Sequence, residues 1–274
     1  MTKGGNAVQI WNRVFLMEPS RQAEATGALV AVHEAINAVS DYGYNLWETV
    51  VGTQGEYGGS ALVPDIGAFT SGALMHDDAD GEVLGALAAA VNDCVDGRPE
   101  DSFWNVAHVL GEWSEVPAYV TNILHRPPLP QLGPLASASI GVAERFHEVT
   151  GAPITVCTSV MGTGPSVRLI VGWGSLADWA AETARGMADS GFQEQLGTAA
   201  AIPGVALLAE SNVMRRLVCG RSVSRIFQAP CAMKCATGPV ARKAPLVYFA
   251  ASTSAPSPVC GRTPPPPGQS SDDR

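Results

Sequence analysis

Two asparagines that lie 110 residues apart are the first candidates for chemistry. Asn12 and Asn122 each stand among apolar neighbours in a segment that predicts a β-strand. A buried amide whose hydrogen bonds are unmade costs on the order of 1–3 kcal/mol, so each side chain needs a partner. Each amide either orients a carbonyl or phenol of a bound substrate or satisfies backbone groups at a strand end. Both interpretations stay open.

Four tryptophans also fall on predicted strands. Their indole rings are candidates for walls of a pocket that binds an aromatic substrate. Tryptophans on strands are more often part of a hydrophobic core, and this alternative stays open too. The four substrate-binding candidates of this kind are Trp11, Trp47, Trp104 and Trp173.

Of the five histidines, His108 and His125 fall on predicted strands and are the candidates for a catalytic base. A general base needs a second group that orients its ring. His33 and His147 fall on predicted helices, which favours partly exposed surface positions. The chain has no HxH or HExxH spacing, so the sequence predicts no metal site and no bound cofactor.

The acidic segment from His76 to Glu82 fails as a calcium loop. If Gly81 took the glycine position, Leu87 would stand where the loop needs its last carboxylate. Acidic residues at the start of a helix offset the helix dipole, which explains the segment without a metal ion.

The charge distribution excludes one class of partner. Residues 1–218 carry 10 Lys and Arg against 24 Asp and Glu, a net charge of −14. Such an acidic body repels phosphate, so nucleic acid is not an expected partner. No stretch of about 18 apolar residues predicts a membrane span, and the first residues do not read as a signal peptide. We therefore expect a cytoplasmic protein.

The residues around Asn12 predict a strand, a helix, two strands, a helix and a strand. Residues 8–17 are apolar on both faces, and the stripe Leu29, Val32, Ile36 and Val39 indicates a helix. This order is that of the ferredoxin-like unit. The further expected segments are strands at 44–53 and 61–70 after a glycine-rich turn at 54–60, a helix at 77–95 and a strand at 103–110.

The same order recurs 110 residues later. The two copies align without a gap from Asn12 to Thr53, and beyond the hairpins we expect the register to drift. Residues 1–112 and 113–218 thus form two predicted repeats. The expected segments of the second are strands at 119–126, 154–163, 167–173 and 205–213, and helices at 135–149, 176–188 with Ser175 as cap, and 192–202.

Residues 219–274 change in character. Acidic residues are absent until Asp272, Cys and Pro are frequent, and residues 264–267 are four prolines. The composition predicts a disordered basic tail. The alternative is a shift of reading frame near Leu217, which would end a periodic acidic domain in the same abrupt way.

Two ferredoxin-like units in one chain resemble the dimeric α+β barrel superfamily, which includes antibiotic-biosynthesis monooxygenases and EthD-like and NIPSNAP-like proteins. The resemblance implies an α+β fold in which two antiparallel sheets pair into a barrel with helices outside. It explains strands that are apolar on both faces, since one face meets the helices and the other the interior. It also implies a small-molecule pocket between sheet and helices. Several members oxidise aromatic polyketides without metal or flavin, and others bind heme.

The sequence therefore predicts a small-molecule enzyme or binder, with cofactor-independent oxygenation of an aromatic or polyketide-like compound as its expected chemistry. In that chemistry Asn12 or Asn122 would orient the substrate, a tryptophan would stack on it, and His108 or His125 would take a proton. The alternatives are a non-catalytic barrel for ligand binding or assembly, and heme binding. The expected partner is a small apolar or aromatic molecule, and the expected state is a monomeric pseudo-dimer or a homodimer.

Overall fold

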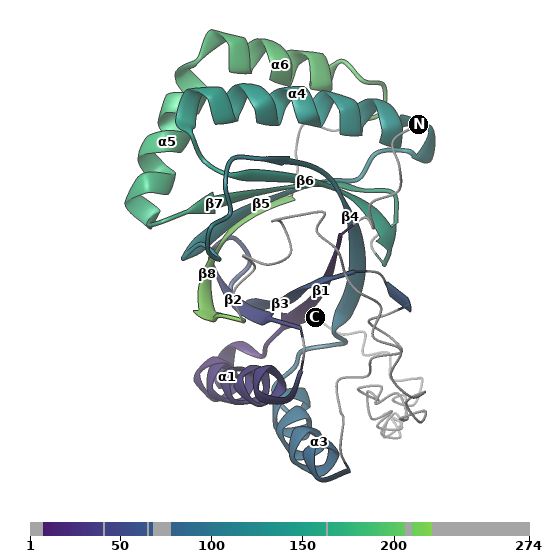
Figure 1. Cartoon of the computed structure of the whole chain (residues 1–274), viewed down its shortest axis with the longest axis vertical. Helices are drawn as coiled ribbons and strands as arrows, with labels where there is room; N and C mark the ends of the chain where they lie inside the picture. Colours follow the sequence, from purple (N-terminus) through teal and green to yellow (C-terminus); the bar gives the residue numbers. More distant parts are fainter. Residues whose placement is uncertain are drawn as a thin grey trace, which may run out of the picture.

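The structure is a computed structural model that describes residues 8–40, 42–64, 66–67, 78–162, 164–205 and 210–220, without the side chains of 78–81. The predictions for the segment at His76 and for the tail after residue 220 lie outside the described residues. Figure 1 shows the described part as one barrel with helices on two opposite sides.

Eight antiparallel strands close into a barrel in the order β1-β3-β2-β8-β5-β7-β6-β4. Closure leaves no free sheet edge among these strands. Their bounds are β1 Gln9–Leu16, β2 Tyr44–Val51, β3 Glu56–Val63, β4 Glu100–Leu110, β5 Tyr119–His125, β6 Ile154–Met161, β7 Val167–Trp173 and β8 Glu210–Val218.

The barrel consists of two four-stranded sheets of the same internal order. The first half is arranged β4-β1-β3-β2 and the second β8-β5-β7-β6, and the halves join where β2 pairs with β8 and β4 with β6. Each half is a ferredoxin-like unit. The predicted fold class, two such units whose sheets pair into an α+β barrel, is confirmed.

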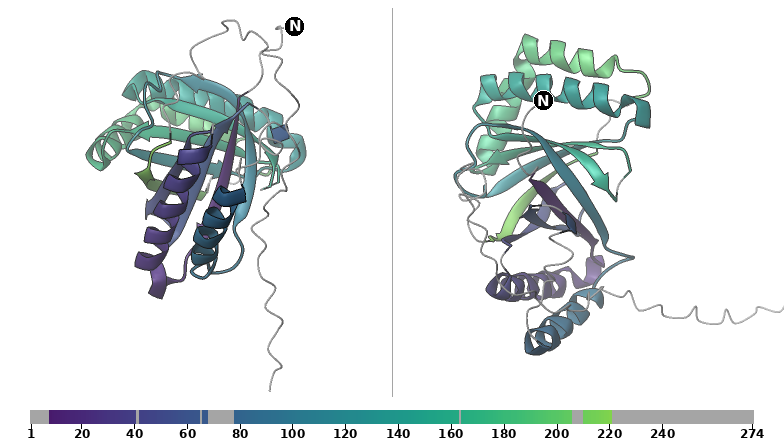
Figure 2. Two further views of the ribbon diagram at one scale, coloured as in Figure 1. Left: turned by 60° about the horizontal axis from the view of Figure 1, so that its bottom comes forward. Right: turned by 45° about the vertical axis from the view of Figure 1, so that its right-hand side comes forward.

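The helices cover the outer faces of the two sheets. Figures 1 and 2 show α1 and α3 on one side of the barrel and α4, α5 and α6 on the opposite side. A short 3-10 turn precedes the first long helix of each half. The bounds are η1 Pro19–Arg21, α1 Gln22–Val39, α3 Asp78–Asn92, η2 Leu129–Gln131, α4 Leu132–Thr150, α5 Leu176–Ala188 and α6 Ser190–Ala200.

Local sequence explains where two of these helices begin. The hydroxyl of Ser175 accepts a hydrogen bond from the backbone N–H of Asp178, so Ser175 caps α5 as predicted. The carboxylate of Asp189 accepts one from the backbone N–H of Phe192 and caps α6. Since Asp189 directly follows α5, the same residue ends one helix and starts the next.

The 110-residue offset extends to the last strand of each half. Asn12 lies opposite Ser102 on β4, and Asn122 lies opposite Asn212 on β8. The predicted drift of the register is therefore wrong for these strands. The closing strand is Glu210–Val218 and not 205–213, because pairing with β5 and β2 fixes it further along the chain.

The third strand also begins earlier than predicted. β3 starts at Glu56, inside the segment expected to be a turn, and ends at Val63. Gly58 pairs with Val14 on β1 and with Trp47 on β2, so cross-strand hydrogen bonding overrides the weak strand preference of glycine. A Cβ at Gly58 would lie 3.3 Å from Met214 Cε, and glycine therefore makes room for Met214 inside the barrel.

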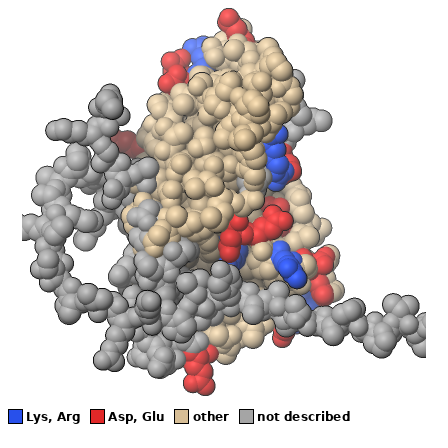
Figure 3. All heavy atoms as spheres, turned by 90° about the vertical axis from the view of Figure 1, so that its right-hand side faces the viewer, with Lys and Arg blue, Asp and Glu red and all other residues tan. Residues whose placement is uncertain are grey.

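Successive strand residues face opposite sides of the barrel wall. On the outer side, one apolar core lies under α1 and α3, and a second lies under α4 and α6. A third cluster consists of Trp47, Val116, Val120 and Met214. Figure 3 shows one face of the surface, where charged side chains form small groups separated by wide areas without Lys, Arg, Asp or Glu.

Candidate functional site

A cavity in the second half lies between its sheet and its helices. This helix-side cavity has a volume of about 270 Å³. Residues from eight elements line it, three helices and five strands, since α4, α5 and α6 cover the sheet with side chains that do not fill the space between them. Its main walls are Val142, Phe146, Trp173, Trp179, Met187 and Phe192.

Aromatic rings give the cavity its shape. The Phe146 ring lies 6.3 Å from the Trp173 ring at 86°, and 5.2 Å from the Phe192 ring. Edge-to-face rings at these distances attract each other beyond the area that they bury. The indole Nε1–H of Trp173 donates to Thr121 Oγ1 at 2.8 Å, so the polar edge of this ring is satisfied without a ligand. The walls are therefore fixed before anything binds.

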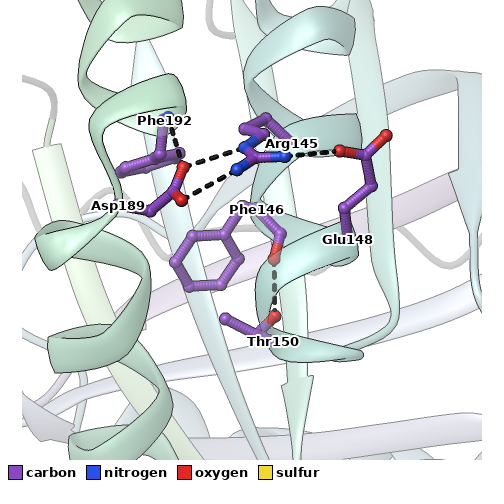
Figure 4. A network of polar contacts seen from close by, with 6 residues as sticks. All are labelled: Arg145, Phe146, Glu148, Thr150, Asp189 and Phe192. Carbon is purple, nitrogen blue, oxygen red and sulfur yellow. Dashed lines mark hydrogen bonds and ion pairs between the residues drawn. The ribbon is translucent and has the colours of Figure 1, made fainter.

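An ion-pair network holds α6 against α4 above the cavity (Figure 4). Arg145 donates from Nε and Nη2 to the two carboxylate oxygens of Asp189, both at 2.8 Å, and Nη1 lies 3.0 Å from Glu148 Oε2. The guanidinium and the backbone N–H of Phe192 lower the pKa of Asp189. Because Asp189 also caps α6, the network fixes the start of the helix that carries Phe192.

The chemistry of this cavity is that of a neutral apolar site. Among the described residues that line it, none is Asp, Glu, His, Lys, Arg, Tyr or Cys, and the polar ones are Thr121, Thr183, Ser211 and Asn212. These side chains can donate or accept one or two hydrogen bonds but cannot exchange protons near neutral pH. Met187, 50% exposed, stands where the cavity meets solvent.

A second space lies inside the barrel. This barrel cavity has a volume of about 110 Å³. Its polar lining includes Asn12, Asn45, Asn122 and Arg168, set among apolar and aromatic side chains such as Trp47. It differs from the helix-side cavity because two charged residues, Arg168 and Glu115, are among its walls.

A chain of hydrogen bonds runs from Arg168 across the barrel wall. Arg168 donates from Nε and Nη2 to Asn122 Oδ1 at 3.1 and 2.6 Å. Asn122 Nδ2 donates to Asn212 Oδ1 at 2.9 Å, and Asn212 Nδ2 donates to Glu56 Oε1 at 2.6 Å. Burial lowers the pKa of Arg168, while Cys157 and Glu56 act in the opposite direction. The Arg168 guanidinium thus donates to an amide and not to a carboxylate. The carboxylate of Glu56 is the third residue along this chain of hydrogen bonds.

The asparagines and tryptophans named from the sequence lie in different places. Asn12, Asn122 and Trp47 line the barrel cavity. Trp104 lies 5.6 Å from the Arg168 guanidinium, which stacks over its ring. Trp173 lines the helix-side cavity. Trp11 belongs to the core under α1, where its ring contacts Tyr44 edge-on at 5.6 Å.

The two histidines lie on the outer side of the wall, away from the asparagines. Val106 lies opposite Cys157 and His108 opposite Val156, so Ala107 is an extra residue that turns His108 outward. His108 Nε2 is 3.6 Å from Glu144 Oε1 on α4. His125 follows the cavity-lining Ile123 by two residues on the same face of β5. Neither histidine lines either of the two cavities.

Several side chains of the two cavities were not among the predicted ones, and Arg168, Phe146 and Phe192 are examples. Arg168 is a single cation within the apolar run Val167–Val171, and such a residue on a strand buried on both faces signals an interior charge. Phe146 and Phe192 gave no such signal, because aromatic residues on an apolar helix face are ordinary core residues. The described residues contain no cluster of His, Cys, Asp or Glu that would hold a metal ion.

Comparison with known proteins rests on structure alone. No family model matches the sequence, and no curated protein matches it either. A monooxygenase, itself so assigned only provisionally, from Fusobacterium nucleatum aligns with a TM-score of 0.56 and 8% identity over 78% of this chain and 94% of its own. An anthrone oxidase-like protein aligns with a TM-score of 0.53 and 14% identity over 80% and 94%. The chain has the dimeric α+β barrel fold.

A third structure agrees. A provisionally assigned monooxygenase from Lactobacillus acidophilus has a TM-score of 0.52 and 9% identity, covering 79% of this chain and 99% of that one. At these identities the likeness concerns the fold of the α+β barrel and not its chemistry. Among the described helices, none is long and apolar enough to cross a membrane.

Proposed function

We propose that this α+β barrel binds a small, neutral, aromatic molecule in the helix-side cavity of its second half. The observation that carries the proposal is a preformed space of about 270 Å³ walled by aromatic rings, with no titratable side chain among the described lining residues. Binding sites for small molecules are typically mostly apolar concave spaces with a few polar groups.

The size of the space suggests the size of the ligand. An engineered cavity of about 150 Å³ accepts benzene, so a space of about 270 Å³ suits a molecule of two fused rings. Thr183 and Ser211 offer hydroxyl groups for one carbonyl or phenol on such a molecule. Naphthalene and 1-naphthol therefore serve as probes without and with a polar group.

Filling the cavity tests the proposal. Val142 projects from α4 into the space, and Val142→Phe would occupy part of it. We expect wild-type protein to bind naphthalene saturably in calorimetric titration and Val142→Phe to bind it at least tenfold more weakly. The matched control is Val160→Phe, the same exchange on β6 at a side chain that is 45% exposed and lines neither cavity. Equal affinities of Val142→Phe and Val160→Phe would exclude this cavity as the site.

Oxygenation of the bound molecule is the second candidate function, and the position of His125 on β5 favours it. His125 stands on the same face of β5 as the cavity-lining Thr121 and Ile123. A two-ring substrate such as 1-naphthol, which with O₂ gives 1,4-naphthoquinone and water, needs a base to remove its phenolic proton. If His125 is that base, His125→Asn lowers the rate of O₂ consumption with 1-naphthol at least a hundredfold and leaves naphthalene affinity unchanged. An unchanged rate would rule out this role for His125.

The structure gives less support to heme binding. Heme proteins commonly supply a proximal histidine, cysteine or tyrosine to the iron. None of these residue types is among the described residues that line the helix-side cavity. Hemin added to wild-type protein and to Val142→Phe should therefore give the same Soret band.

A further inference from the structure

We infer that the barrel cavity is a second binding site, separate from the helix-side cavity, and that it takes a small carboxylate with a short apolar body. Arg168 and Asn12 are the groups that would hold the carboxylate, and both line the cavity. This inference does not depend on the function proposed above.

The first argument is the state of Arg168. Its guanidinium lies inside the barrel, where Nε and Nη2 share one acceptor, Asn122 Oδ1, and its face covers the Trp104 ring. A guanidinium has five N–H donors in a planar fork, and this geometry leaves those of Nη1 without a partner among the described residues. No carboxylate of the described chain pairs with it, and an unpaired buried charge is costly. A bound carboxylate would supply the missing partner as a charge-assisted acceptor.

The second argument is the state of Asn12. The residue is only 5% exposed, its side chain lines the same cavity, and the amide has no hydrogen-bond partner among the described residues. Its equivalent, Asn122, is bonded on both sides by Arg168 and Asn212. The difference arises because the first half has no arginine at the equivalent position. Two residues after Asn122, Leu124 pairs with Arg168, whereas two residues after Asn12, Val14 pairs with Gly58. One cation and one free amide thus line a single small space.

The third argument is the size and nature of the remaining walls. The cavity of about 110 Å³ is smaller than the space of about 150 Å³ that accepts benzene, so a chain of about four carbons fits better than an aromatic ring. Ile10, Val106 and Val120 supply apolar contact for such a chain. Two carboxylates oppose an anion here: Glu56 at the end of the hydrogen-bond chain, and the exposed Glu115, which also lines the cavity. Both are therefore expected to limit affinity.

The probes are butyrate and its neutral analogue butyramide, which differ in charge but hardly in shape. Calorimetric titration of the wild-type chain should show saturable binding of butyrate at least tenfold tighter than that of butyramide and of acetate. Arg168→Gln should remove this preference for the anion. Asn12→Leu should weaken butyrate binding at least threefold while keeping the preference, because the cation remains.

Two further variants keep the test decisive. Arg168→Lys retains the charge and should retain part of the preference, so a folding defect of Arg168→Gln can be separated from loss of the site. Val142→Phe, which fills the helix-side cavity, should leave butyrate affinity unchanged, so that the two sites succeed or fail separately. The inference is overturned if wild type binds butyrate no better than butyramide, if it shows no saturable binding, or if folded Arg168→Gln keeps the preference. If the cavity holds only water, butyrate will show no saturable binding.

Discussion

Asn12 and Asn122 occupy equivalent positions 110 residues apart, yet only Asn122 has side-chain hydrogen bonds within the described part of the chain. Asn122 joins Arg168 to Asn212, whereas the Asn12 amide faces the barrel cavity and has no partner among the described residues. The two halves share a fold and differ in what their interior polar groups do. The same two residues therefore allow matched experiments.

Replacing each asparagine by leucine should affect stability very differently. Asn122→Leu leaves the half-buried Arg168 and Asn212 without their shared partner, and we expect a loss of about 2 kcal/mol in the free energy of unfolding. Asn12→Leu removes an amide that has no bond to lose, and we expect a change within about 0.5 kcal/mol or a gain. Urea unfolding of both variants measures the difference. Equal losses would contradict the hydrogen-bond assignment.

The glycines of the helices predict a second contrast. A Cβ at Gly186 of α5 would lie 2.2 Å from Phe146 Cε2, whereas one at Gly27 of α1 would meet nothing within 4 Å. Gly186→Ala should therefore push α5 away from the ring and destabilise the protein by about 1–3 kcal/mol. Gly27→Ala should stabilise it by about 0.5–1 kcal/mol, because alanine favours the helix. Thermal unfolding of the two variants would move in opposite directions, and a shift in the same direction would argue against this packing.

The buried His33 predicts a dependence of stability on pH. Burial lowers the pKa of His33 to about 4, and its Nδ1–H donates to the Leu29 carbonyl at 2.8 Å. The unfolded chain, with a pKa near 6.5, binds the proton more readily than the folded one, so stability falls as pH falls from about 6.5 to 4. The expected loss from this residue is about 3 kcal/mol.

His33→Asn keeps a donor near the position of Nδ1 and removes the titration. Urea unfolding at pH 7.5 and at pH 4.5 should show a clearly smaller pH difference for this variant than for wild type. If the two proteins lose the same stability over this range, His33 is protonated in the fold and the pKa assignment fails.

The hydrogen bonds of Asp189 to Arg145 and to the Phe192 N–H predict that alanine and asparagine at position 189 lower stability by different amounts. Asp189→Ala removes both the helix cap and the ion pair with Arg145, and we expect a measurable loss in the free energy of unfolding. Asp189→Asn keeps a capping oxygen for the Phe192 N–H, so its loss should be smaller. Chemical unfolding tests the order. If Asn and Ala have the same effect, the capping bond contributes nothing measurable.

The sequence predicted the fold well where its internal repeat indicates the order of helices and strands. It predicted the bounds of strands less well where hydrogen bonding to neighbouring strands sets them. The offset between Asn12 and Asn122 predicted two like halves, and the resemblance to the α+β barrel superfamily implied that their sheets close into a barrel. The start of β3 was missed because Gly58 reads as a turn residue, and only its partners on β1 and β2 place it in a strand.

Alternation along a strand predicted some of the site but could not show which face points inward. Trp104 and Val106 lead one to expect His108 inside the barrel as well, but the bulge at Ala107 reverses its direction. Trp11 lies on the opposite face from Asn12 and therefore packs under α1. The cavity under α4 depends on how three helices sit on the sheet, and a pattern within a single helix cannot give that.

The central claim is that a neutral aromatic molecule binds under α4, α5 and α6. The most direct measurement is an NMR experiment that detects nuclear Overhauser effects between naphthalene protons and assigned methyl groups of the wild-type chain. We predict contacts to methyl groups of Val142 and Leu169, which line the helix-side cavity. Contacts confined to Ile10 and Val106 inside the barrel, or no contacts at a saturating concentration, would contradict the account.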